Sequence, residues 1–154
     1  MANPLKELPL QNVSFQRIQE TSIDAPPAKV WAALVKPNNW FGFDADRATW
    51  PKSTLDLRPG GVWVMEGKDG MASLMATVTH IEPGKLLRFS GQMGMTHVPC
   101  VCVFIFELQP KNDGKGTLLR VGQRVSGYMD PEAEKRSEGG WQQLMGNLKK
   151  ASEG

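Results

Sequence analysis

Four turn sequences divide residues 49–128 into short segments, and their spacing limits the possible folds more than any other feature of the chain. They are Pro59-Gly60-Gly61, Lys68-Asp69-Gly70, Glu82-Pro83-Gly84 and Asn112-Asp113-Gly114. Glycine next to proline, aspartate or asparagine favours tight turns, including those that join antiparallel strands. Six strands fit between and around them, over about 52–57, 61–67, 71–81, 85–91, 98–109 and 116–127. We therefore expect an antiparallel sheet with one buried face and one face in water.

The last of these strands shows which side chains face the core, because successive residues of a strand point to opposite faces. One parity carries apolar and small polar side chains, namely Thr117, Leu119, Val121, Gln123 and Val125. Arg120 and Arg124 have the opposite parity, so they are expected to point outward. By the same alternation, Glu66 and Arg88 are expected to point outward from their own strands.

The strand over 98–109 is apolar on both parities. The inner parity contains Cys102, Phe104, Phe106 and Leu108, and the outer parity contains Val101, Val103, Ile105 and Glu107. An apolar outer face has three explanations: the N-terminal segment covers it, a second subunit covers it, or it is a modest exposed apolar surface. A homodimer is therefore one of the expectations.

Helical segments are expected on both sides of these strands in the sequence. After a strand over 13–23, prolines 26 and 27 suit the first turn of a helix over 28–36, and Pro37 ends it. Residues 38–43 are expected to form a short aromatic turn or helix. Near the C-terminus, Asp130-Pro131-Glu132 is typical of a helix start. The inward face of this last helix is Trp141, Leu144, Met145 and Leu148.

Gly139-Gly140 interrupts the helical pattern, and it marks a kink, a close approach or a place where the helix begins again.

Length and charge limit the class of protein. The 154 residues suit one domain, which we place at 13–150, with an extension over 1–12 and a tail over 151–154. The net charge of +2 is too small for a nucleic-acid binder that acts by neutralising phosphates. No apolar run approaches the roughly 18 residues of a membrane span. Residues 1–12 lack the profile of a signal peptide, so we expect a cytoplasmic protein.

Cysteine and histidine give no sign of a metal site or a catalytic centre. Cys100 and Cys102 are two residues apart on one strand face, where their Cβ atoms would lie about 6.6 Å apart, too far for a regular disulfide. A Cys-x-Cys pair supplies two of the four ligands that zinc needs. We predict two buried thiols, which also fits a reducing compartment. His80 and His97 are isolated, and we expect no metal and no catalytic residue.

Several short motifs resemble, in order, those of the SRPBCC (START-like) superfamily. The first is Ile23-x-Ala25-Pro26-x-x-x-Val30-Trp31-x-Ala33-Leu34. The middle ones are Leu57-Arg58-Pro59-Gly60-Gly61-Val62-Trp63, Asp69-Gly70 and Ile81-Glu82-Pro83-Gly84-Lys85-Leu86-Leu87. The last are Phe106-Glu107-Leu108, Gly116-Thr117-x-Leu119 and Gly140-Trp141-x-x-Leu144-x-x-x-Leu148. Over roughly residues 15–150 the chain looks like the branch of heat-shock-protein ATPase-activator homologues.

The resemblance implies an α+β helix-grip fold. In that fold an antiparallel sheet of six or seven strands wraps around a long C-terminal helix, and a short helical hairpin follows the first strand. A cavity lies between the sheet and the long helix. Relatives bind lipids, sterols or aromatic small molecules, some are polyketide cyclases, and some act on a chaperone. None of these functions leads us to expect a cofactor in this chain.

Aromatic and methionine side chains are the candidates for lining such a cavity, because they give large contacts and adapt to ligands of different shape. The predicted ligand-binding residues are Trp31, Trp40, Phe43, Trp50, Trp63, Met65, Met75, Phe89, Cys102, Phe104, Trp141, Leu144 and Met145. The hypothesis is binding of a small hydrophobic or aromatic molecule. A first alternative is a polyketide cyclase or dehydratase-like enzyme, which needs an inward polar group. A second is a chaperone-linked protein–protein interaction module that uses the apolar outer parity of 98–109.

Overall fold

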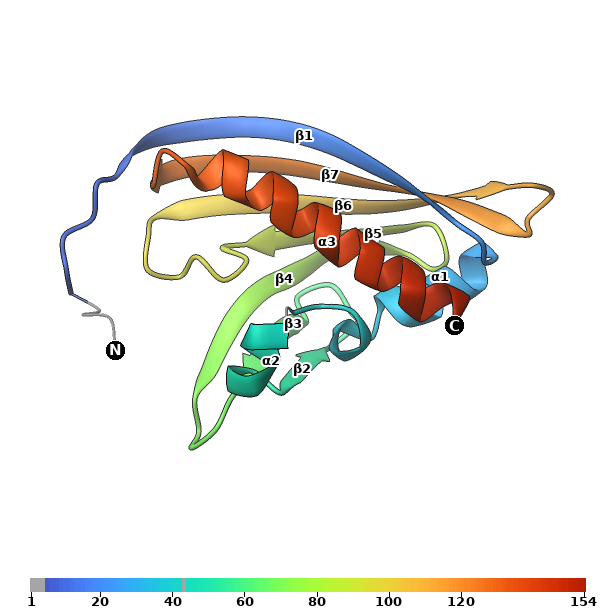
Figure 1. Ribbon diagram of the computed structural model, residues 1–154, viewed down its shortest axis with the longest axis horizontal. Coiled ribbons are helices and arrows are strands. Elements are labelled where there is room, and N and C mark those ends of the chain that lie inside the picture. The colour runs from blue at the N-terminus through green and yellow to red at the C-terminus, as the bar shows by residue number, and fades with distance from the viewer. Residues whose placement is uncertain (1–4, 43) are drawn as a thin grey trace.

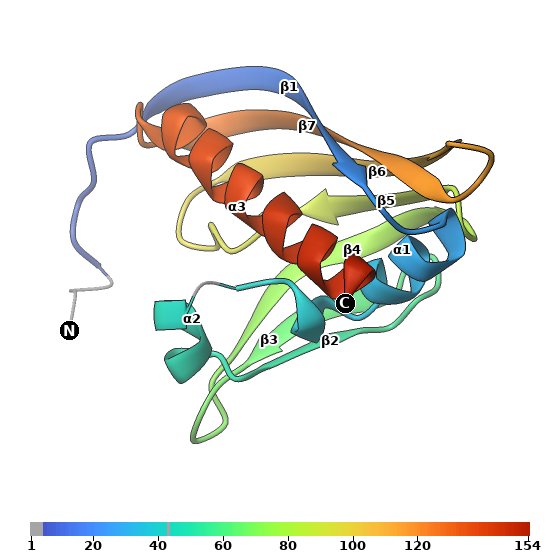
Figure 2. The same ribbon diagram turned by 45° about the vertical axis from the view of Figure 1, so that its right-hand side comes forward.

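A long C-terminal helix lies across one face of a single antiparallel sheet (Figures 1 and 2). The computed structural model describes residues 5–42 and 44–154, with only the backbone for residues 44–46. The strands of the described residues are β1 (Gln11–Ile23), β2 (Lys52–Leu55), β3 (Val62–Glu66), β4 (Ala72–Glu82), β5 (Leu86–Gly91), β6 (Cys100–Lys111) and β7 (Gly116–Met129). The helices are α1 (Pro27–Leu34), the 3₁₀ turn η1 (Pro37–Asn39), α2 (Asp44–Thr49) and α3 (Ala133–Glu153).

The strand order confirms the expected α+β helix-grip architecture. The sheet runs β1-β7-β6-β5-β4-β3-β2, so the first strand of the chain pairs with the last, and every neighbouring pair is antiparallel. The longest strands, β1, β6 and β7, lie together, and the sheet curves around α3 (Figure 1). All six strands expected after the first helix are present, with bounds shifted by a few residues.

The expected alternation of faces is confirmed in the two central strands. In β7 the predicted inner set is buried, whereas Arg120 is half-buried and Arg124 is exposed. In β6 the inner set of Cys102 and its neighbours is buried beneath α3. Glu66 and Arg88 also have the less buried parity of their strands. The alternation therefore identifies the face that carries the core.

Both ends of α3 differ from the expectation. The helix begins at Ala133, three residues after Asp130, but the Asp130 carboxylate still accepts the backbone N–H of Glu132 at 2.8 Å. It continues to Glu153, so residues 151–153 are helical, and Ser152 is buried and donates to the Leu148 carbonyl at 2.7 Å. The helix runs without interruption through Gly139 and Gly140, because packing on the sheet outweighs the low helix propensity of two glycines.

Aromatic rings fill the core between α3, η1 and the middle of the sheet. Trp40 lies 5.9 Å from Trp63 between ring centroids, and Trp63 lies 5.2 Å from Phe89. Both indole N–H groups are satisfied inside the core: Trp40 donates to the Leu34 carbonyl at 3.1 Å and Trp63 to the Ser53 hydroxyl at 2.8 Å. A buried indole whose N–H is paired avoids the desolvation penalty of an unmatched donor.

Candidate functional site

A cavity of about 300 Å³ lies between the inner face of the sheet and the N-terminal half of α3. Its walls come from β1, β6, β7, α3, the segment after η1 and the loop between β5 and β6. The lining residues are Phe15, Phe41, Met93, Met95, Cys102, Phe104, Gln123, Val125, Ala133, Arg136, Ser137, Gly140, Trp141 and Leu144. Its volume is at the lower end of the range for small-molecule sites.

Most of the cavity wall is apolar or aromatic. The rings of Phe104 on β6 and Trp141 on α3 lie 4.6 Å apart between centroids and form one end. Met93 and Met95 come from the β5–β6 loop, and both are partly buried against the core. Gly140 adds no side chain to the α3 wall, which leaves space opposite the sheet. Such a surface gains free energy by releasing water to an apolar ligand.

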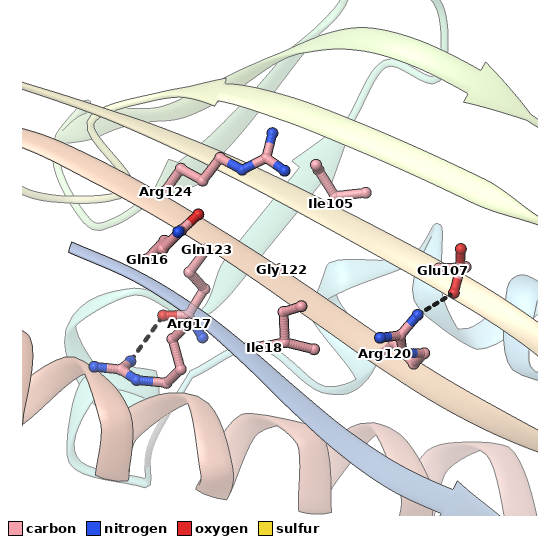
Figure 3. A pocket seen from close by; sticks show the side chains of 9 residues that line it. All are labelled: Gln16, Arg17, Ile18, Ile105, Glu107, Arg120, Gly122, Gln123 and Arg124. Atoms are coloured by element: carbon pink, nitrogen blue, oxygen red, sulfur yellow. Dashed lines mark hydrogen bonds and ion pairs between the residues drawn. The ribbon is translucent and has the colours of Figure 1, made fainter.

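One buried amide interrupts the apolar wall. The side chain of Gln123 on β7 is only 1% exposed, and its position is fixed by two neighbours on β1. The Arg17 guanidinium donates to Gln123 Oε1 at 3.0 Å (Figure 3). Gln123 Nε2 donates to Gln19 Oε1 at 2.7 Å. These contacts determine which way the amide points, because its oxygen faces a cation and its nitrogen faces an oxygen.

Arg17 ties this amide to the helix. Its guanidinium also donates to the Ser137 hydroxyl at 3.1 Å and to the Glu134 carbonyl at 2.8 Å, and it lies 5.2 Å from the centre of the Phe15 ring. Ser137 in turn donates to the Glu134 carbonyl at 2.8 Å. The hydroxyl hydrogen of Ser137 is therefore already used, whereas Gln123 Nε2 keeps one hydrogen without a partner in the described residues.

The titratable side chains that line the described cavity are Cys102 and Arg136. Burial raises the pKa of the Cys102 thiol to about 12, and the neighbouring thiol Cys100 acts in the same direction. Cys102 therefore stays protonated at neutral pH and is a poor nucleophile or base. Arg136 is held by Asp130 at 3.0 Å, on the rim of the cavity. Both cysteines are free and buried, as predicted.

Four of the predicted ligand-binding residues line the cavity: Cys102, Phe104, Trp141 and Leu144. Six others are buried in the core away from it, namely Trp40, Trp63, Met65, Met75, Phe89 and Met145. Trp31 and Trp50 are partly buried against the core, and Phe43 lies outside the described residues. The aromatic cluster after α1 thus contributes Phe41 to the cavity, while Trp40 fills the core.

The sequence analysis missed the contribution of β1 to the cavity. Phe15 has the same parity as Ile23, so its inward position was readable from the alternation. Arg17 shares that parity, but an arginine on an inner face contradicts the usual pattern. Gln123 was recognised as inward, and only the structure shows that it borders open space.

No group of three or more histidine, cysteine, aspartate or glutamate side chains that could hold a metal ion occurs among the described residues. None of the helices in that part of the chain is long and apolar enough to cross a membrane.

Comparison with known proteins identifies the family. The model of the family described as activator of Hsp90 ATPase homolog 1-like protein matches residues 24–153. The chain belongs to this family. No curated protein matches it. The match includes α1, the whole of α3 and most of the cavity wall, and it leaves out all of β1, which carries Phe15 and Arg17.

Solved structures share the fold at low sequence identity. A protein from Rhizobium leguminosarum is 17% identical with a TM-score of 0.72, and the match covers 94% of this chain and 97% of that one. The Mll3558 protein from Rhizobium loti is 22% identical with a TM-score of 0.69, covering 92% and 99%. CalU16 from Micromonospora echinospora is 19% identical with a TM-score of 0.60, covering 94% and 87%. These likenesses show the SRPBCC-type fold.

Proposed function

We propose that this protein binds a small hydrophobic or aromatic molecule that carries one hydrogen-bond acceptor. The observation that carries this proposal is an apolar cavity of about 300 Å³ with one buried, oriented amide in its wall. The SRPBCC-type fold commonly encloses hydrophobic ligands, which supports the same function. The ligand body would lie against Phe104, Trp141 and Leu144.

The ligand would gain specificity from Gln123. Its Nε2 donates one hydrogen to Gln19, and the second is free for a ligand oxygen in the cavity. Its Oε1 already accepts from Arg17, so an acceptor on the ligand suits this amide better than a donor. A ligand without such an acceptor would displace water from this N–H and leave the donor without a partner, which costs about 1–3 kcal/mol of binding free energy.

The cyclase or dehydratase-like alternative requires an inward polar group, and Gln123 meets that minimum. The amide could polarise a carbonyl, but proton transfer also needs a general acid or base. Cys102, the titratable group on the sheet wall, has a pKa of about 12 and stays protonated. Binding without catalysis is therefore the function that these groups support best.

The cytoplasm stays our proposed compartment. Cys100 and Cys102 are free thiols, which suits a reducing environment.

Native mass spectrometry of gently purified protein, followed by solvent extraction, tests the proposal. We expect one small apolar molecule per chain. If the protein is purified empty, calorimetric titration measures the binding of two matched probes instead. The probes are naphthalene and methoxynaphthalene, which adds an ether oxygen as a hydrogen-bond acceptor. Wild type should bind methoxynaphthalene more tightly, and the Gln123→Leu variant should bind both probes alike. Failure of wild type to bind either probe, together with an empty mass spectrum, contradicts the proposal.

A further inference from the structure

A second, smaller cavity adjoins the first at the end of the sheet where α3 begins. Its volume is about 150 Å³, and we call it the annex. Met95, Ala133 and Arg136 line both spaces. These three side chains therefore form the partition between the annex and the larger cavity.

The segment before β1 forms the outer wall of the annex. Residues 8–10 line it on the side of the solvent, and the buried Val98 and Met129 line it on the side of the core. In both views the segment before β1 descends past the end of the sheet where α3 begins (Figures 1 and 2). The family match starts at residue 24, so the annex depends on residues outside the matched region.

The partition contains one long side chain that can move. Met95 is unbranched, and methionine adapts to irregular space by rotation about three bonds. Its backbone is fixed independently of the side chain, because its carbonyl accepts the Gln92 amide at 3.3 Å and its N–H donates to the Gln92 carbonyl at 3.0 Å. Of the other two members, Ala133 ends at a methyl group, and Arg136 is tied to Asp130 at 3.0 Å. Rotation of Met95 therefore controls the passage between the two spaces.

The annex is apolar on its inner side and polar at its rim. Val98 and Met129 supply the buried apolar wall, whereas His97, Asp130 and Arg136 lie where the annex meets the solvent. At roughly 30 Å³ for each atom, the volume that a water molecule takes in the liquid, the annex holds about five non-hydrogen atoms. It is thus too small for a second aromatic body and large enough for a short chain.

We propose that the ligand has two parts, an aromatic or apolar body in the cavity and an unbranched apolar arm in the annex. This inference rests on the proposed function and names its ligand class more closely, as an aromatic molecule with a short alkyl or alkoxy chain. The body lies against Phe104 and Trp141, and the arm passes Met95 to contact Leu8 and Val98. The arm is unbranched because the displacement of one methionine side chain opens only a narrow passage.

Alkoxynaphthalenes of increasing chain length test the proposal by calorimetric titration. Each buried methylene strengthens binding by about fourfold. Butoxynaphthalene should therefore bind wild type about tenfold or more tightly than methoxynaphthalene, because its three further methylenes enter the annex. Octyloxynaphthalene should bind no more tightly than butoxynaphthalene, since the annex has no room for the rest of its chain.

The first variant, Leu8→Asp, changes the annex and leaves the cavity intact. It places a carboxylate in the outer wall, and the fold should tolerate it because Leu8 is already 41% exposed. The advantage of butoxynaphthalene should fall to about twofold or less, because the arm then lies against a charge. Leu5→Asp is the matched control, since Leu5 is on the same segment, is 90% exposed and does not line the annex. It should keep the full advantage.

The second variant, Val98→Phe, fills the annex from the side of the core. Val98 lines the annex and not the cavity, so this variant should bind methoxynaphthalene like wild type and lose the advantage of butoxynaphthalene. Val101→Phe makes the same change at an exposed position of β6 and should behave like wild type. If Val98→Phe does not fold, the comparison of Leu8→Asp with Leu5→Asp decides the question.

Three results would overturn the two-part ligand and leave the proposed function standing. The first is a wild type that binds methoxynaphthalene but binds butoxynaphthalene no more tightly. The second is an advantage that persists in both Leu8→Asp and Val98→Phe, because the arm then lies elsewhere. The third is an equal loss in Leu5→Asp, which would assign the effect to the charge of the segment. If wild type binds neither probe, the proposed function fails and this inference fails with it.

Discussion

Leucine at Gly140 should close the cavity while strengthening the helix. Gly140 lines the cavity from α3, so a side chain added there would enter the space that we assign to the ligand. The neighbouring Gly139 provides the matched control, because it is exposed and a Cβ there would meet no atom within 4 Å. Both positions lie inside α3, so Gly→Leu improves helix propensity equally at each.

The two variants should differ in stability, because only the leucine at position 140 buries apolar surface. Replacing glycine with leucine in a helix stabilises it by about 0.8 kcal/mol. At Gly139 this is the whole effect, which corresponds to a rise in melting temperature of about 2–3 °C. At Gly140 the leucine also buries apolar surface in the cavity of about 300 Å³, adding about 1.5 kcal/mol. The total of about 2 kcal/mol raises the melting temperature by about 4–8 °C.

Differential scanning calorimetry measures the stabilities, and calorimetric titration with methoxynaphthalene measures binding. Gly140→Leu should be the more stable variant and should lose binding, whereas Gly139→Leu should bind like wild type. If Gly140→Leu is less stable than Gly139→Leu, the new side chain overpacks the site and the space is not available. If it is more stable and still binds the probe as wild type does, the cavity is not the ligand site.

Three further predictions concern stability. The Cys102 thiol has a pKa of about 12 in the folded state and about 9.0 in the unfolded state, so it loses its proton first on unfolding. Its contribution to the free energy of unfolding therefore falls between these pH values, by up to about 1.4 kcal/mol per pH unit. Cys102→Ala should remove this pH dependence in urea denaturation experiments, and an unchanged pH dependence would contradict the burial effect. Hydrogen bonds from the Glu132 N–H and from Arg136 lower the pKa of Asp130. The Asp130→Ala variant should therefore be less stable than wild type at pH 7, and this difference should disappear as the carboxylate is protonated below its ordinary pKa of 3.8. A difference in stability that persists in acid would show another cause. Trp63→Ala should cost about 3–5 kcal/mol in chemical denaturation, and a cost below 1 kcal/mol would mean that the aromatic core is not where the stability lies.

The local pattern of the sequence determined the sheet and its faces. The turns that contain Gly60, Gly70, Gly84 and Gly114 separate the strands. Each of these glycines has a positive φ, a backbone conformation that glycine adopts without steric cost. Period-two alternation in β6 and β7 identified the buried face, because each side chain of a strand has a fixed direction. The i, i+3, i+4 spacing around Trp141 likewise identified the buried stripe of α3.

Tertiary structure alone decided which inward side chains border open space. Trp63 and Phe104 both have inward parity, yet the first fills the core and the second lines the cavity. The difference depends on how α3 crosses the curved sheet, and a pattern of alternation holds no information about that crossing. The same holds for the contact of Arg17 with Gln123, which lie 106 residues apart in the sequence.

The charge pattern of the outer face has the same origin. Glu20, Arg120 and Glu107 come from three strands, and the sequence gives each of them an outward parity without placing them in one row. Only the pairing register of β1 with β7 and of β7 with β6 aligns them beside Gly122. Local sequence thus sets the direction of each side chain, because backbone geometry is local. Cavities and charged rows depend on the register and packing of segments that are distant in the chain.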